Sequence, residues 1–249
     1  MSGHDAGHFD RIADRYDDAR PRYPAALWAV LEDAGVVHPG ARVLELGAGS
    51  GQATRELVAR GAVVDAVEPG PALAAALSAT VPAVTVHHAR AEEVELAPAG
   101  YDAVVAATAW HWMDPAAVLP AVHRALRPGG LLAVWWNVFG DEDVPTPFRA
   151  RVEEISQEVG LARRGPVDAL QTGARRAELA AGGLFVPRDP VVLRWQVDLT
   201  PGRLRALFAS FPTWARTPGA VDKIETAAEE CGPVVTEHYL TAVYVADRA

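Results

Sequence analysis

The stretch that decides the fold runs from Val43 to Thr54 and reads VLELGAGSGQAT. Its first residues form a short apolar run bounded by glycine, which predicts a buried strand, and the residues after Gly51 favour a helix. Gly47, Gly49 and Gly51 permit a tight turn with positive φ and a close approach of a ligand to the backbone. N–H groups at the start of the helix can bind an anionic group. The stretch therefore predicts a site for a nucleotide-like ligand between a strand and a helix.

A carboxylate closes the second predicted strand, which is the apolar run at residues 62–67. Glu68 stands at the end of this run, and Pro69 follows it. A carboxylate in this position can accept hydrogen bonds from both hydroxyls of a ribose. Together with the glycine-rich turn, Glu68 indicates a cofactor that contains adenosine.

The glycine spacing distinguishes two classes of cofactor. A nicotinamide dinucleotide fingerprint counted from Gly47 needs glycine or alanine at position 52, where this chain has Gln52. The run from Glu45 to Gly51 instead resembles the first motif of class I S-adenosylmethionine-dependent methyltransferases. The resemblance implies that the turn holds the methionine part of the cofactor and that the acid of the second strand holds its ribose. The residues implicated here are Glu45, Gly47, Ala48, Gly49, Gly51, Gln52, Glu68 and Pro69.

The composition limits the class of protein. The chain has 249 residues, of which 50% are hydrophobic and 22% charged, enough to bury a large core in one α/β domain. The single cysteine, Cys231, excludes an intrachain disulfide framework and fits a cytoplasmic location. A formal net charge of −9 argues against a general nucleic-acid partner. We find no signal peptide and no apolar run long enough to cross a bilayer, so no membrane partner is expected.

Apolar periodicity predicts alternating strands and helices along most of the chain. Strands are expected near residues 42–46, 62–68, 84–88, 101–107, 131–138, 193–199 and 234–245. With the resemblance, this pattern implies an α/β fold with a doubly wound, Rossmann-like methyltransferase sheet of seven strands, mostly parallel, with a C-terminal antiparallel hairpin. We expect an N-terminal helical lid at residues 1–36, a cofactor-binding core at 37–140, and substrate-specificity helices with the rest of the sheet at 141–249.

A second informative stretch, ATAWHWMD at residues 107–114, follows the fourth predicted strand. Ligands of an open α/β sheet bind beyond the carboxyl ends of its strands, so this cluster is expected to face cofactor and substrate. Combined with LRPGGLLAVW at 126–135, it resembles the type-11 methyltransferases, particularly the trans-aconitate-methyltransferase-like branch. The resemblance extends to residues 9–24. It implies that further cofactor contacts come from Ala91, Glu92, Thr108 and Trp110, although Glu92 reads equally well as a solvated loop carboxylate.

The Trp-His-Trp cluster has two readings. Methyl transfer is an in-line displacement that needs alignment and exclusion of water, and the aromatic faces of Trp110 or Trp112 can stabilise a sulfonium. Alternatively, these rings form a hydrophobic floor. His111 can remove a proton from a hydroxyl or amine acceptor, or it can simply line the pocket, since a carboxylate acceptor needs no base.

The N-terminal segment is the remaining candidate part of the site. Phe9, Ile12, Ala13 and Tyr16 share one face of a short helix, and a second helix begins at Leu27. This segment either closes over the cofactor, with Tyr16 as a catalytic residue near the methyl donor, or only covers an edge of the sheet. The candidate substrate-binding residues are Arg20, Trp112 and Trp136.

Three functions fit the sequence. The first is methyl transfer from S-adenosylmethionine to a small-molecule acceptor at oxygen, nitrogen or a carboxylate, in bacterial secondary metabolism. The second is a methyltransferase fold that binds the cofactor but guides another reaction or has no catalysis. The third, a nicotinamide oxidoreductase, is disfavoured by Gln52. We expect no metal ion, because the acidic run 141–143 lacks a matching ligand group, and we expect a monomer or homodimer.

Overall fold

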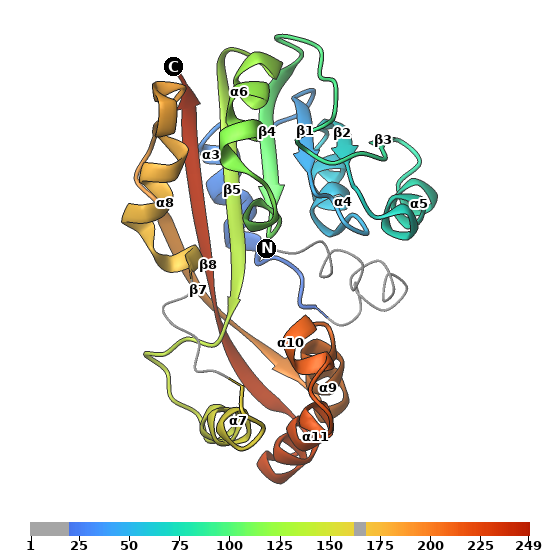
Figure 1. The fold of residues 1–249 in the computed structure, drawn as a ribbon, viewed down its shortest axis with the longest axis vertical. Coiled ribbons are helices and arrows are strands. Elements are labelled where there is room, and N and C mark those ends of the chain that lie inside the picture. Colours follow the sequence, from blue (N-terminus) through green and yellow to red (C-terminus); the bar gives the residue numbers. More distant parts are fainter. Residues whose placement is uncertain (1–19, 162–167) are drawn as a thin grey trace.

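The protein is a mixed α/β structure built on one sheet of eight strands (Figure 1). The computed structural model describes residues 20–161 and 168–249. The strands are β1 (Arg42–Leu46), β2 (Val63–Val67), β3 (Thr85–His87), β4 (Tyr101–Ala107), β5 (Leu126–Phe139), β6 (Phe185–Pro187), β7 (Val191–Leu199) and β8 (Val235–Arg248). Their order is β3-β2-β1-β4-β5-β8-β6, and β7 also pairs with β8.

The strand directions confirm the predicted fold class. β1 to β5 pair in parallel, and β8 is antiparallel to β5, β6 and β7. The sheet holds eight strands instead of the expected seven because two separate strands, the short β6 and the longer β7, share one edge of β8. β6 pairs with residues 246–248 and β7 with residues 235–243. The interruption between them contains Pro190, which cannot donate a ladder hydrogen bond.

Helices cover both faces of this sheet and one of its ends. The α-helices of the described residues are α3 (Ala25–Asp33), α4 (Gln52–Ala59), α5 (Pro71–Thr80), α6 (Pro115–Ala125), α7 (Pro147–Glu158), α8 (Thr172–Leu179), α9 (Pro201–Ala209), α10 (Pro212–Ala215) and α11 (Ala220–Cys231). The residues at the N-termini of these helices favour helix initiation. A proline is the first residue of α5, and the side chain of Asp114 caps α6 by accepting the N–H of Ala116 at 3.0 Å.

Adjacent tryptophans on β5 belong to opposite cores, because successive side chains of a strand alternate between faces. Trp135 packs with α3 and α4, whose buried residues include Leu31 and Leu57. Trp136 packs with residues of α6 and α8, including Val122. This two-sided burial is the doubly wound arrangement that the sequence predicted.

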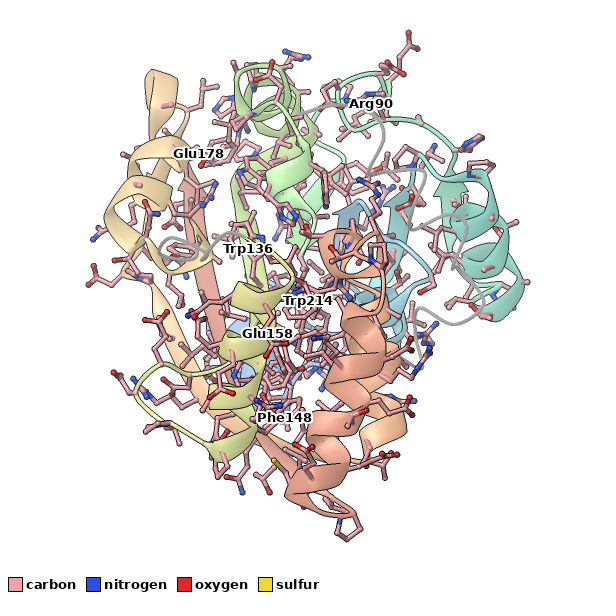
Figure 2. All side chains as sticks on the ribbon, turned by 60° about the horizontal axis from the view of Figure 1, so that its bottom comes forward. Arg90, Trp136, Phe148, Glu158, Glu178 and Trp214 are labelled. Atoms are coloured by element: carbon pink, nitrogen blue, oxygen red, sulfur yellow. The ribbon has the colours of Figure 1, made fainter. Side chains whose placement is uncertain are left out.

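Four helices form a cap beyond the carboxyl end of β5. The strands β5 and β8 continue past their neighbours, and α7, α9, α10 and α11 gather around this extension (Figure 1). Their shared core contains Phe148 and Trp214, both labelled in Figure 2. The cap thus lies at the end of the sheet where the parallel strands end and a ligand is expected.

The predicted lid is only partly within the described residues. Residues 1–19, including Tyr16, lie outside them. The second predicted helix is present as α3, and its Leu27 and Leu31 are completely buried. α3 is therefore part of the core of the domain.

Candidate functional site

The glycine-rich turn joins the end of β1 to the start of α4. Its three glycines have positive φ: +70° at Gly47, +59° at Gly49 and +95° at Gly51. A Cβ at Gly47 would lie 2.6 Å from Cβ of Ala109, and one at Gly51 would lie 2.5 Å from Cδ1 of Leu77. A Cβ at Gly49 would meet no atom of the described residues within 4 Å. A side chain at Gly47 or Gly51 would therefore crowd its neighbours, whereas the described residues leave room for one at Gly49.

Glu68 connects this turn to the end of β2. Its carboxylate accepts the backbone N–H of Gly49 at one oxygen and that of Gly70 at the other, both at 2.8 Å. The residue is only 6% exposed. A carboxylate offers about four lone-pair positions, and one at the end of the second strand is placed to accept hydrogen bonds from ribose hydroxyls. Glu68, the predicted ribose-binding residue, therefore lies directly beside the glycine-rich turn.

Glu45 lies inside the domain below the turn. It is 1% exposed, and the hydroxyl of Thr54 donates to its carboxyl at 2.6 Å. Burial raises the pKa of Glu45 to about 8, and the nearby Glu68 adds to this rise. At neutral pH Glu45 is therefore mostly protonated, which allows two acids to stand close together.

Gln52 and Arg20 connect the N-terminal segment to two parts of the site. The side-chain amide of Gln52 donates to the backbone oxygens of Arg20 and Pro21, both at 3.4 Å. Nε of Arg20 donates to Oγ of Ser210 at 3.2 Å, and its guanidinium lies 5.3 Å from the ring centre of Phe211. Arg20 thus bridges the cofactor side of the domain and the helical cap.

The other predicted cofactor residues lie on neighbouring loops. Ala91 is buried in the core with Trp110. Glu92 accepts the backbone N–H of Asp114 at 3.0 Å, so it holds the end of the Trp-His-Trp loop. The backbone oxygen of Pro69 is 3.0 Å from Nε2 of His88. Ala48, in the glycine-rich turn, is buried with 7% exposure.

Thr108 begins the loop after β4 in an unusual conformation. Its φ is +55°, which is an outlier for a β-branched residue. Its N–H donates to the oxygen of Trp135 at 2.7 Å, and its hydroxyl is 2.9 Å from that of Tyr23. Thr108 therefore meets β5 and the N-terminal segment at the carboxyl end of β4.

The three aromatic residues of the loop have different surroundings. Trp110 is completely buried, and its indole N–H donates to Glu178 of α8 at 2.8 Å. Trp112 is 37% exposed, and its ring lies 4.8 Å from that of His111. Of the two tryptophans considered for a sulfonium, only Trp112 therefore offers a ring face at the surface of the described protein.

His111 is joined to β5. Nε1–H of Trp136 donates to Nδ1 of His111 at 3.0 Å. The guanidinium of Arg175, from α8, lies 4.9 Å from the ring centre of Trp136 and pairs with Glu178. Trp136 and Glu178 are labelled in Figure 2, on β5 and α8 respectively. Sequence reasoning missed Arg175 and Glu178, since no local pattern marks them.

The acidic run at the end of β5 forms ion pairs. Arg194 of β7 pairs with both Asp141 and Asp143. Within residues 20–161 and 168–249, no group of three or more His, Cys, Asp or Glu side chains is arranged to hold a metal ion.

In the same ranges, every helix is too short or too polar to cross a membrane.

The sheet order and the glycine-rich turn between β1 and α4 define a Rossmann-like α/β protein. The profile of a family described as a methyltransferase domain matches residues 44–134. An uncharacterised methyltransferase of Schizosaccharomyces pombe is 32% identical over 208 residues, which are 83% of this chain and 79% of the relative. The chain belongs to the class I S-adenosylmethionine-dependent methyltransferases.

Two further likenesses agree with this family. An uncharacterised methyltransferase of Mycobacterium tuberculosis is 43% identical over 131 residues, 52% of this chain and 51% of the relative. The match thus spans about half the length of that relative. A solved structure of a candidate type II methyltransferase from Anaeromyxobacter dehalogenans has a TM-score of 0.67 and 24% identity, and the likeness covers 91% of this chain and 97% of that one. This structure supports the fold.

Proposed function

We propose that the protein transfers a methyl group from S-adenosylmethionine to a small-molecule acceptor. The observation that carries the proposal is the pairing of Glu68 with Gly49. Glu68 holds the turn by the N–H of Gly49 at 2.8 Å, and the same glycine leaves its Cβ direction open among the described residues. The cofactor would bring an activated methyl group on a sulfonium to this site.

The residues of the chain would then do three things. Glu68 would accept hydrogen bonds from the ribose hydroxyls, and the backbone at Gly49 would let the cofactor approach closely. Trp112 and His111 would border the reacting atoms at the carboxyl end of β4. The helical cap and Arg20 would bind the acceptor and exclude water.

The proposal includes the kind of group that is methylated and the setting of the reaction. We propose methylation at oxygen, nitrogen or a carboxylate, in bacterial secondary metabolism, by a cytoplasmic monomer or homodimer. Support for a small-molecule acceptor over a nucleic acid comes from the formal net charge of −9, which disfavours binding of a polyanion.

The test is calorimetric binding of S-adenosylhomocysteine to Glu68→Ala and Glu68→Gln. Loss of a charged hydrogen-bond acceptor costs about 1.5–3 kcal/mol, or roughly 10- to 150-fold in affinity. Glu68→Gln keeps the size of the side chain but loses the charge, so it should bind with intermediate affinity. Glu56→Ala, on the outer side of α4, is the matched control because Glu56 pairs with Arg60. Unchanged binding by a folded Glu68→Ala protein would end the assignment.

A turnover assay separates methyl transfer from cofactor binding alone. The wild-type protein is incubated with S-adenosylmethionine and a panel of hydroxyl, amine and carboxylate acceptors. Formation of S-adenosylhomocysteine that depends on an acceptor supports the proposal. Tight binding without turnover on every acceptor class would favour a binding protein on the same fold.

A further inference from the structure

The hydrogen bond between Trp136 and His111 has a fixed direction. An indole Nε1–H can only donate, so Nδ1 of His111, 3.0 Å away, accepts with its lone pair. In a neutral imidazole one nitrogen accepts and the other carries the proton. The proton of neutral His111 therefore sits on Nε2.

The surroundings of Trp136 make it the rigid member of this pair. It is 5% exposed, lies near the carboxyl-terminal end of β5, and its ring packs edge-on against Tyr244 at 6.0 Å. Arg175, whose side chain is 10% exposed, places its guanidinium over the ring at 4.9 Å. A cation over an aromatic face is attracted to it, which further fixes the ring. The exposed His111 is thus oriented by a buried donor.

We propose that Trp136 is a positioning residue that holds His111 in the Nε2–H tautomer, so that His111 donates a hydrogen bond in the site and does not act as a base. The catalytic role of His111 rests on the proposed methyl transfer. The tautomer of His111 does not depend on that proposal. A base must offer a lone pair, and the Nε2 atom of this tautomer has none available.

This assignment defines which acceptor groups suit the site. The acceptor atom must attack with a lone pair that it already has, without first giving a proton to His111. One bond then forms between that atom and the methyl carbon, while the carbon–sulfur bond breaks and its electron pair stays on sulfur. An acceptor that enters as an anion leaves no proton to remove, and Nε2–H of His111 can stabilise such a group by hydrogen bonding.

The test is nitrogen NMR of the full-length, ¹⁵N-labelled protein without cofactor. At pH 8.5, about two units above the ordinary histidine pKa, the imidazole rings are neutral and their protonated and unprotonated nitrogens are resolved. The chain has eight histidines, so the His111 signals are assigned by difference from a His111→Gln protein. We expect Nε2 to be the protonated nitrogen of His111.

Two tryptophan variants test the cause of this preference. Trp136→Phe removes one neutral hydrogen bond, so the ratio of the Nε2–H to the Nδ1–H tautomer should fall about 2- to 13-fold. Trp195→Phe is the matched control, because its indole N–H donates to Thr241 at 2.9 Å and has no bond to His111. The ratio in that protein should equal the wild-type ratio.

Either of two results would overturn the proposal. One is a wild-type protein in which Nδ1 of His111 carries the proton. The other is a folded Trp136→Phe protein with an unchanged tautomer ratio. Neither depends on S-adenosylhomocysteine binding, so failure of the proposed function and failure of this inference are seen in separate measurements.

Discussion

Replacing Gly49 by alanine should weaken cofactor binding at least tenfold with little damage to the fold. The added Cβ would meet no described atom of the protein within 4 Å, so among the described residues its cost to folding comes from the backbone conformation. Gly49 has φ of +59°, and the left-handed conformation costs an L-residue about 1–2 kcal/mol. In a domain of this size that corresponds to a fall in Tm of about 2–8 °C. The methyl group would, however, occupy the space that the cofactor needs.

Gly40 provides the matched control at the other end of β1. Its φ is +82°, and a Cβ there would also meet no described atom within 4 Å. Gly40→Ala should therefore lose a similar amount of stability and keep cofactor affinity. Gly49→Ala should bind S-adenosylhomocysteine at least tenfold more weakly, about 1.4 kcal/mol or the size of one lost charged hydrogen bond.

The two variants are compared by thermal unfolding and by calorimetric titration with S-adenosylhomocysteine. Equal losses of Tm with unequal affinities would place the cofactor against the turn. Equal affinities in the two folded variants would refute the reasoning, because the open space at Gly49 would then have no connection with the ligand.

Two buried acids should make stability depend on pH. Burial raises the pKa of Glu45 to about 8, so between about pH 4.5 and 8 the folded state holds a proton that the unfolded state has lost. The contribution of Glu45 to the free energy of unfolding is therefore largest below about pH 4.5. It falls by up to about 1.4 kcal/mol per pH unit as the pH rises to 8. Urea unfolding of Glu45→Gln between pH 5 and 8.5 should show a smaller slope than wild type; an equal slope would contradict a buried neutral acid. Burial also raises the pKa of Glu237 to about 7, against the opposing effect of Arg149, so Glu237→Gln should reduce the fall in stability between about pH 4.5 and 7. The same urea series checks this, and a Glu237→Gln protein with the wild-type profile would argue that Glu237 is ionised when folded.

Local patterns were sufficient to predict the parallel half of the sheet. Apolar runs bounded by glycine or proline mark β1, β2 and β4 because a buried strand and its turn are specified by neighbouring residues. The position of Glu68 at the end of β2 followed from the same runs. Its bond to Gly49 then comes from the parallel register, in which Leu46 lies beside Val67.

Contacts between distant residues could not be predicted in this way. The sequence allowed Trp110 either to contact the sulfonium or to form a hydrophobic floor, and it gave no sign that Glu178, 68 residues later, accepts the indole N–H. A position just after the fourth strand fits both a ring that contacts a ligand and a ring buried in the core. The partner of His111 was equally hidden, because Trp136 and Trp135 differ only in which face of β5 they occupy.

The strained backbone at Thr108 connects a local feature of the sequence, the loop after β4, with contacts from distant residues. A β-branched residue with φ of +55° costs about 1–3 kcal/mol and persists only where the surroundings determine it. Here the surroundings are the oxygen of Trp135, which accepts the N–H at 2.7 Å, and the hydroxyl of Tyr23 at 2.9 Å from Oγ1. Tyr23 is itself held by edge-on contact with Trp135 at 6.0 Å. The described end of the N-terminal segment thus supports the loop that carries His111, so a change at Tyr23 acts on the proposed reaction through the backbone of Thr108.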